Sequence, residues 1–199
     1  LGLSWEGRRI EGTLLRRMPG GFQKTADFQA ELSLDIDSGD PETLGKELRA
    51  QLDQAGIRER LCAVALSVSS LLVTQTEIPI LADADADSLL QLEAEKGFHA
   101  DASTLQVAYS RCARVEGSQW VTLAALPQTR LAWLERLMGA ARLKLVSVSS
   151  NIGGLQGPSD PSSDGVIALN LGSGPGPVTL QITAGGGIVA LRSFEGVTE

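Results

Sequence analysis

A nearly continuous apolar run, Leu61 to Val68, constrains the fold of this chain more than any other feature. A strand with apolar side chains on both faces is covered on both faces, as in the centre of a parallel sheet. Just before it, Asp40 and Pro41 predict a helix start, and Gly56 predicts its end. The run therefore predicts a central buried strand that follows a covering helix.

The remaining segments alternate between strand and helix patterns without forming a simple strand–helix–strand array. In chain order, the pattern predicts three strands (1–5, 10–16, 28–36, with a loop at 18–26), the first helix, the buried strand, an extended segment (71–80), a helix (83–96, closed by Gly97), a hairpin (105–125), a helix from Pro127, a strand (143–149), a Gly/Pro/Ser-rich linker (151–165) and a three-stranded meander (166–194). This order predicts a mixed α/β or α+β protein.

Composition excludes several functional classes. The net charge of −7 and only eight aromatic residues argue against a nucleic-acid-binding protein, which needs a basic face and stacking platforms. His99 is the only histidine, so His-rich metal sites are excluded, and we interpret it as a surface or capping residue. Cys62 and Cys112 suit a reducing compartment as small buried residues. No apolar run approaches the ~20 residues of a membrane span.

Three local patterns have both a structural and a functional interpretation. The glycine-rich stretch from Gly172 to Gly176 is interpreted as a β-hairpin turn, or alternatively as a hairpin that cradles a phosphate. The acidic run from Asp83 to Asp87 resembles the start of a calcium loop, but a calcium loop would have Gly and Glu where Ser88 and Ala94 stand. Acidic residues at a helix start are favoured by the helix dipole, which explains the run without a metal.

Arginine and tryptophan residues have ordinary structural interpretations. The pairs Arg8-Arg9 and Arg16-Arg17 could form a basic patch, but the net charge of −7 favours solvated strand ends or local ion pairs. Trp5, Trp120 and Trp133 lie within apolar patterns, so we expect them in the core.

The order of elements resembles the N-terminal half of PilM, the actin-like protein of type IV pilus assembly, and the related GspL-type scaffold of type II secretion. The resemblance is carried over nearly the whole chain by the order and spacing of stretches that are weak individually: 1–7, 77–81, 89–97, 137–144, 165–172, 178–187 and Arg192. It implies an actin-like (ribonuclease H-like) core, residues 1–78 completed by 143–163. It further implies a small inserted α/β subdomain at 79–142, and at 164–199 the first strands of an incomplete second large subdomain.

The resemblance also implies two phosphate-binding hairpins, both degenerate in this chain. Their positions correspond to Ser4, Glu6 and Gly7 in the first hairpin and to Gly172, Ser173 and Gly174 in the second. Actin-like ATPases have an Asp where Ser4 stands, a Gly where Glu6 stands and a Lys where Glu11 stands. The second hairpin should start with Asp, and Asn170 stands there. Phosphoryl transfer depends on charge placement, so we expect no hydrolysis, no metal and no required cofactor, with ATP and Mg²⁺ as the only candidates.

Three functions compete on the sequence. The first is a non-catalytic scaffold of pilus or secretion assembly, the second is an actin-like ATPase switch, and the third is a small-molecule enzyme that uses Asp and Glu. The missing carboxylates favour the first over the second, and no close acid pair outside a helix start supports the third. The second subdomain ends early, which indicates either a truncated chain or a natural half-cleft.

The resemblance implies a partner as well. In the family, the cytoplasmic N-terminal peptide of a PilN-type inner-membrane protein lies in a groove, which here would involve the segments 71–81 and 105–115. We therefore expect a cytoplasmic protein held at the inner membrane by that partner. We expect no direct membrane insertion, because no anchor is present and anionic lipid would repel a net charge of −7. The apolar meander at 166–194 also suggests pairing with a second copy or with missing sequence.

Overall fold

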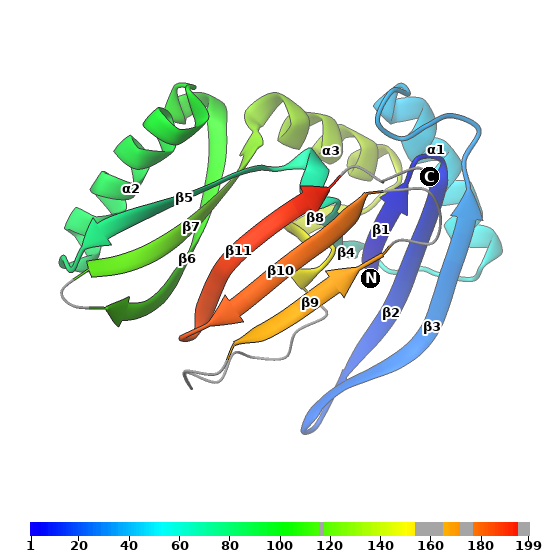
Figure 1. Cartoon of the computed structure of the whole chain (residues 1–199). Helices are drawn as coiled ribbons and strands as arrows, with labels where there is room; N and C mark the ends of the chain where they lie inside the picture. The colour runs from blue at the N-terminus through cyan, green and yellow to red at the C-terminus, as the bar shows by residue number, and fades with distance from the viewer. Residues whose placement is uncertain (116–117, 154–164, 172–176, 195–199) are drawn as a thin grey trace, which may run out of the picture. The chain divides into compact units, whose positions relative to one another are not determined.

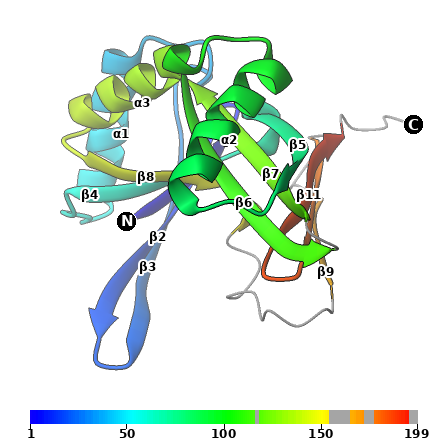
Figure 2. The same cartoon turned by 90° about the vertical axis from the view of Figure 1, so that its left-hand side faces the viewer.

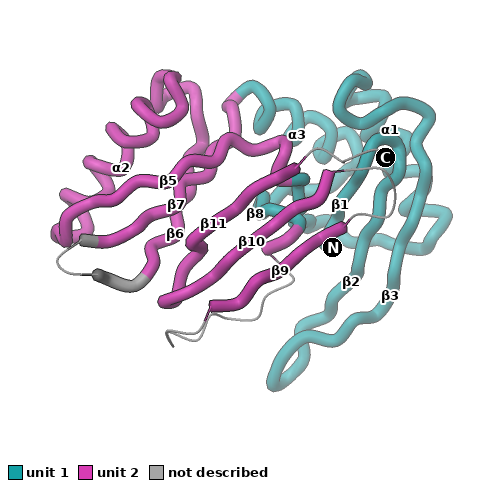
Figure 3. The backbone as a smooth tube through the Cα atoms, in the orientation of Figure 1, with its two compact units in different colours: residues 1–67, 129–151 teal, residues 68–128, 152–199 magenta. Residues whose placement is uncertain are grey.

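The computed structural model describes residues 1–115, 118–153, 165–171 and 177–194. Its elements in chain order are β1 (Gly2–Glu6), β2 (Arg9–Met18), β3 (Gly21–Glu31), α1 (Pro41–Gln54), β4 (Leu61–Leu66), a 3-10 turn (Val68–Ser70), β5 (Leu72–Pro79), α2 (Asp83–Phe98), a second 3-10 turn (Ala102–Thr104), β6 (Leu105–Val115), β7 (Ser118–Pro127), α3 (Gln128–Ala140), β8 (Lys144–Ser150), β9 (Val166–Asn170), β10 (Val178–Ala184) and β11 (Gly187–Phe194) (Figure 1). The described chain forms two compact units, residues 1–67 with 129–151 and residues 68–128 with 152–199 (Figure 3).

Unit 1 is a five-stranded mixed sheet in the order β3-β2-β1-β4-β8. β1 to β3 form an antiparallel meander, and β4 pairs in parallel with β1 on one side and with β8 on the other. This order confirms the central position predicted for the apolar run, since β4 has a parallel neighbour on each edge. In β4, Cys62 and Val64 are fully buried, and α1 and α3 lie together on one face of the sheet (Figure 2).

Helix α1 follows the sequence prediction at both ends and on its buried face. Leu44, Leu48 and Leu52, spaced four residues apart, are each fully buried. Pro41 occupies the first turn, where its missing N–H costs nothing. The residue after the cap is Gly56, whose φ of 72° is in the left-handed region that glycine tolerates best.

The start of α1 depends on an ionised carboxylate. The Asp40 carboxylate accepts hydrogen bonds of 2.8 Å from both the hydroxyl and the backbone N–H of Thr43. The hydroxyl bond above all, and then the backbone bond, holds the pKa of Asp40 below its ordinary 3.8. The unfolded chain therefore binds a proton at Asp40 at a higher pH than the folded chain does. This contribution to stability is present above the ordinary pKa and is lost as the pH falls through the lowered folded value.

We expect Asp40→Asn to weaken the acid dependence of unfolding. Asparagine keeps the capping oxygen but cannot be protonated. Thermal unfolding should show a smaller fall in Tm below about pH 4 for the variant than for the parent chain. Equal slopes for the two proteins would mean that the Asp40 cap does not contribute to acid sensitivity.

Unit 2 holds two three-stranded sheets, one in the order β5-β7-β6 and one in the order β11-β10-β9. Helix α2 covers one face of the first sheet, with a core that contains Ile78, Ala86, Leu90, Ala94, Val121 and Leu123. On the opposite face, the Thr122 hydroxyl donates to the Ile188 carbonyl at 2.6 Å, and the Ile188 N–H donates to the Ser110 hydroxyl at 2.9 Å. The start of β11 is thus fixed to that face by hydrogen bonds.

The strand order of the β11-β10-β9 sheet in unit 2 repeats the order of β3-β2-β1 in unit 1. β9 to β11 form an antiparallel meander, as β1 to β3 do. The fold is therefore mixed α/β, as the sequence predicts. The predicted inserted subdomain at 79–142 stays a prediction. The compact units themselves divide at residues 68 and 129, because α3 packs with α1 in unit 1.

Three local predictions were wrong. Residues 18–26 are not a loop, because β2 runs to Met18 and β3 begins at Gly21. The predicted strand at 28–36 ends at Glu31, and the N–H groups of Leu32 and Ile36 then donate to the turn between β1 and β2. Helix α2 continues past Gly97 to Phe98, and His99, at a φ of 51°, is its C-cap residue.

Candidate functional site

The first predicted phosphate hairpin is the tight turn between β1 and β2. Glu6 and Arg9 close the ladder, and Gly7 has a φ of 57° at the first central position, as in a type II′ turn. The Gly7 carbonyl accepts from the Ile36 N–H at 3.1 Å, and the Arg8 carbonyl accepts from the Leu32 N–H at 2.9 Å. The turn is therefore anchored through its carbonyls by the segment that follows β3.

The structure brings Ser4, Glu6 and Gly7 together in this hairpin and places Glu11 directly across from Ser4. The Glu11 carboxylate pairs with the Arg9 guanidinium at 2.8 Å. Arg8 pairs with Glu31 at 3.4 Å and donates to the Leu32 carbonyl at 2.9 Å. The interpretation of Arg8 and Arg9 as local ion-pair partners is confirmed, and these pairs engage both arginines of the turn with carboxylates of the same sheet.

The first candidate hairpin carries Glu6, Glu11 and two ion-paired arginines. Carboxylates bind phosphate through a shared metal ion, and a carboxylate with no metal repels it. Among the described residues, no group of three His, Cys, Asp or Glu side chains could hold a metal ion together. Both arginines that could attract a phosphate have carboxylate partners. Any nucleotide would have to compete with these ion pairs.

The second predicted hairpin is described only at its edges. Asn170 ends β9 and lies opposite Thr179 of β10. Gly172, Ser173 and Gly174 lie outside the described residues. Asn170 thus occupies the end of a strand that leads into the predicted hairpin.

The segments predicted to border a peptide groove are the two outer strands of the β5-β7-β6 sheet. They are not neighbours, because β7 lies between them. β5 pairs with β7 in unbroken register from Leu72 to Pro79, whereas the β6–β7 pairing is irregular between Arg111 and Arg114. A straight, regular outer strand accepts an added strand more readily than a bulged one. β5 is therefore the better candidate edge.

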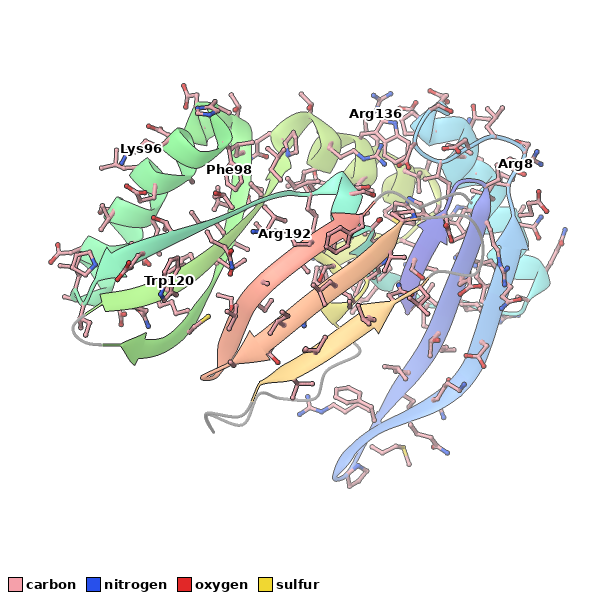
Figure 4. The ribbon with its side chains drawn as sticks, in the orientation of Figure 1. Arg8, Lys96, Phe98, Trp120, Arg136 and Arg192 are labelled. Carbon is pink, nitrogen blue, oxygen red and sulfur yellow. The ribbon has the colours of Figure 1, made fainter. Side chains whose placement is uncertain are left out.

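Trp120 lies on β7 beside this edge, and its exposure is a feature that the sequence did not indicate. The residue, labelled in Figure 4, is 48% exposed, so the prediction of a core position was wrong. Glu77 of β5 lies directly across from Trp120 in the register. Trp5 and Trp133 are half-buried, and the Arg130 guanidinium stacks 4.3 Å from the Trp133 ring. Exposed tryptophans are enriched among residues that dominate binding energy. The apolar surroundings of Trp120 in the sequence gave no signal of its exposure.

The acidic run at the start of α2 forms ion pairs within unit 2. The Arg111 guanidinium contacts Asp83 at 2.8 Å and Asp87 at 3.2 Å, and the Tyr109 hydroxyl donates to Asp87 at 2.5 Å. The hydrogen bond to Asp87 raises the pKa of Tyr109. The run thus tethers α2 to β6 in addition to favouring the helix dipole.

The two cysteines are free and buried, as predicted. Burial raises the pKa of the Cys62 thiol to about 11 and raises the pKa of Cys112 as well. A thiol is nucleophilic only as the thiolate, so burial leaves both side chains unreactive at neutral pH. They act here as small core residues.

Known structures define the class of fold. No model of a known protein family matches the chain, and no curated protein matches it. The likeness of the chain to solved structures shows that it has an actin-like ATPase fold. A structure from Bacteroides thetaiotaomicron with that fold and unknown function matches at a TM-score of 0.50 and 11% identity, over 99% of this chain and 70% of the other.

Two further structures belong to assembly systems. The chain matches a structure of a PilM–PilN type IV pilus biogenesis complex at a TM-score of 0.77 and 17% identity, over 98% of this chain and 60% of the other. It matches the cytoplasmic domain of EpsL, an inner-membrane component of the type II secretion system of Vibrio cholerae, at a TM-score of 0.59 and 17% identity, over 96% of this chain and 69% of the other. The chain thus spans about 60% of the matched chain of the pilus complex. At these identities the likeness establishes the fold.

Among the described residues, no helix combines the length and the apolar character needed to cross a bilayer.

Proposed function

We propose that this protein is a non-catalytic scaffold of type IV pilus or type II secretion assembly that binds the cytoplasmic tail of an inner-membrane protein. The observation that carries the proposal is the likeness to the PilM–PilN complex over 98% of the chain. The EpsL likeness supports the same class of assembly. On this proposal the protein works at the cytoplasmic face of the inner membrane, held there by its partner.

The outer edge of β5 is the proposed site for the tail. An extended peptide that adds to a sheet edge gains affinity from main-chain hydrogen bonds and specificity from side-chain contacts. β5 offers eight residues in regular register, and the exposed side chains of Leu72, Ile80 and Leu81 lie at its two ends. Trp120 adds an exposed aromatic surface on the neighbouring strand.

The direct test is a fluorescence anisotropy titration with the N-terminal cytoplasmic peptide of a PilN-type protein from the same organism. We expect saturable binding below about 100 μM, which corresponds to a binding free energy of about 5.5 kcal/mol. A scrambled peptide of the same composition is the control. No binding to the folded protein at that concentration would count against the scaffold.

A pair of proline variants tests whether the β5 edge is the acceptor. Neighbouring residues of an outer strand direct their N–H groups alternately toward the sheet and away from it. Of Thr76→Pro and Glu77→Pro, one therefore removes a donor from the β5–β7 ladder and lowers Tm, while the other removes an outward donor. We expect the variant that keeps the higher Tm to lose peptide affinity by about tenfold. Unchanged affinity in that variant would place the peptide elsewhere.

The proposal includes the absence of ATP turnover. The reasons are Ser4 and Asn170 at the positions where actin-like ATPases have carboxylates, and Glu11 where they have a lysine. We expect no Mg²⁺-dependent release of phosphate above background. Turnover near 1 s⁻¹, the low end for ordinary enzymes, would favour an ATPase switch instead.

Thermal shift measurements with Mg·ATP separate binding from hydrolysis. A ligand at 100 times its Kd stabilises the folded state by about 2.7 kcal/mol, so binding without turnover would still raise Tm. We expect no rise for the parent chain and only a small one for the double variant Ser4→Asp with Asn170→Asp. A large shift in the double variant would mean that the two carboxylates alone had been lacking.

A further inference from the structure

The β2–β3 hairpin contains an arm, residues 14–26, that has no other strand beside it. β1 pairs with β2 only as far as Thr13, so beyond that residue β2 and β3 pair only with each other among the described residues. Figure 2 shows this part of the hairpin extending past the other strands of its sheet. At about 3.4 Å per residue, the five residues from Leu14 to Met18 carry the tip about 17 Å beyond β1.

The arm combines exposed apolar and basic side chains. Phe22 is 74% exposed, Leu15 52% and Met18 44%, although no core lies beneath them. Residues 14–26 contain Arg16, Arg17 and Lys24 and no acidic residue, in a chain of net charge −7. Lys24 pairs with Asp27 at the base of the arm, and the structure records no ion pair for either arginine among the described residues. Two cations and three large apolar groups are therefore presented to solvent.

The two kinds of side chain are mixed on both faces of the ribbon. The register places Arg17 opposite Phe22 and Leu15 opposite Lys24 on one face, because directly opposed residues point the same way. Arg16 and Met18, one position along from Arg17, belong to the other face. A docking site for a protein would concentrate its contacts on one face. A tip that is apolar and basic on both faces is suited to an environment that contacts both faces at once.

The tip is built as a compact reverse turn. Met18 and Gly21 close the ladder, and Pro19 with Gly20, at a φ of 90°, fit the central positions of a type II turn. The Thr25 hydroxyl donates to the Leu14 carbonyl at 3.1 Å near the base. Proline fixes one backbone dihedral of the turn, which limits the conformations open to the tip.

We propose that this arm contacts the surface of a bilayer that contains anionic phospholipid, with Phe22 and Met18 in the interface and Arg16 and Arg17 at the headgroups. Short apolar protrusions flanked by basic residues bind such surfaces through burial of apolar area together with charge attraction. The net charge of the chain does not prevent this contact. The tip lies about 17 Å beyond β1, roughly two Debye lengths at physiological salt, so the charge of the rest of unit 1 is screened there.

The contact goes beyond the scaffold function and complements it. A protein held near a membrane by one tail gains avidity from a second, weak contact with the same surface. The bilayer experiment uses protein-free vesicles, so its result does not depend on whether the tail peptide binds.

The test is co-sedimentation of the full chain with vesicles of phosphatidylcholine alone and of phosphatidylcholine with 30% phosphatidylglycerol. We expect binding to the anionic vesicles at 50 mM salt, weaker binding at 500 mM salt, and little binding to the neutral vesicles. Each basic residue near an anionic surface contributes about fivefold in partitioning. The double variant Arg16→Glu with Arg17→Glu should therefore bind at least about twentyfold more weakly.

Matched controls separate the effect of charge on the arm from the effect of the net charge of the chain. The double variant Arg58→Glu with Arg60→Glu changes the net charge by the same amount at two exposed positions far from the arm in sequence and should bind within about twofold of the parent chain. Phe22→Ser should weaken binding by about tenfold, whereas Phe194→Ser, which changes a second exposed phenylalanine, should not. No binding to anionic vesicles, equal binding to neutral ones, or equal losses in both arginine double variants would overturn the proposal.

Discussion

The Gly45→Ala variant is expected to unfold roughly 5–10 °C below the parent chain, from about 2–3 kcal/mol of overpacking. Gly45 lies in α1 where the helix meets the end of α3. A Cβ there would overlap the Leu137 carbonyl and would lie 2.6 Å from the Ala140 Cβ and 3.1 Å from the Ala141 N. The carbonyl belongs to the backbone, so relief requires the two helices to separate.

The control for this variant is Gly139→Ala in α3. A Cβ at Gly139 would meet nothing within 4 Å, and alanine is favoured over glycine inside a helix by up to about 1 kcal/mol. The same substitution should therefore leave Tm unchanged or raise it. If both variants shift Tm alike, close helix contact at Gly45 is not the cause. Differential scanning calorimetry measures both values.

The second large effect is expected for Gly187→Ala, at the start of β11. A Cβ at this position would overlap the Arg111 carbonyl oxygen and would lie 2.6 Å from the Arg111 carbonyl carbon and 2.9 Å from the Cys112 N. These are backbone atoms of β6, so alanine should push β11 away from the sheet. The two hydrogen bonds that hold Ile188 to Thr122 and Ser110 would then lengthen or break.

We expect this variant to lose about 3 kcal/mol of stability, the upper part of the usual range for overpacking. Amide hydrogen exchange should show faster exchange in β10 and β11 than in α1, because the damage begins at β11. Gly165→Ala is the matched control, since its Cβ would come no closer than 3.5 Å to another atom. Unchanged exchange in β10 and β11 of Gly187→Ala would mean that the close approach is not needed.

Elements with a buried face were predictable from the sequence. The leucines of α1 and the apolar run of β4 report their burial directly, because a period of 3.6 or a continuous apolar stretch reflects the surface that covers them. The arm of the β2–β3 hairpin was missed for the opposite reason. Residues 21–26 form a strand with nothing beneath it, so no alternation of apolar and polar residues marks it.

Two further differences depend on which segments of the chain pack together. Gly97 reads as a helix end, yet a Cβ there would lie 2.8 Å from the Thr74 Cγ2, so the glycine permits α2 to approach β5. Trp120 lies in an apolar sequence but on a face that α2 does not cover. Neither fact is encoded within a few residues of the position, because each depends on a partner that is distant in sequence.

The candidate hairpin was placed correctly because a turn glycine between two strands is a local signal. Gly7 is at such a turn, and Ser4 and Glu11 face each other across it. The sequence predicted that Arg8 and Arg9 form local ion pairs but did not identify the partners. The partners follow only from the register of three strands. The peptide edge at β5 needed the strand order, which places β7 in the middle of the sheet.

The parallel pairing of β4 with β8 limits the order in which parts of the nascent chain can fold during synthesis. The Cys62 thiol and the Lys144 carbonyl that it contacts are separated by 82 residues. At roughly 5–20 residues per second, a ribosome needs about 4–16 s to make that stretch. Within that interval the whole β5-α2-β6-β7 segment is synthesised, and the apolar core between its sheet and α2 contains only residues of that segment. The part of the chain made second can therefore fold first, while the apolar strand β4 waits for its outer neighbour and needs protection from aggregation.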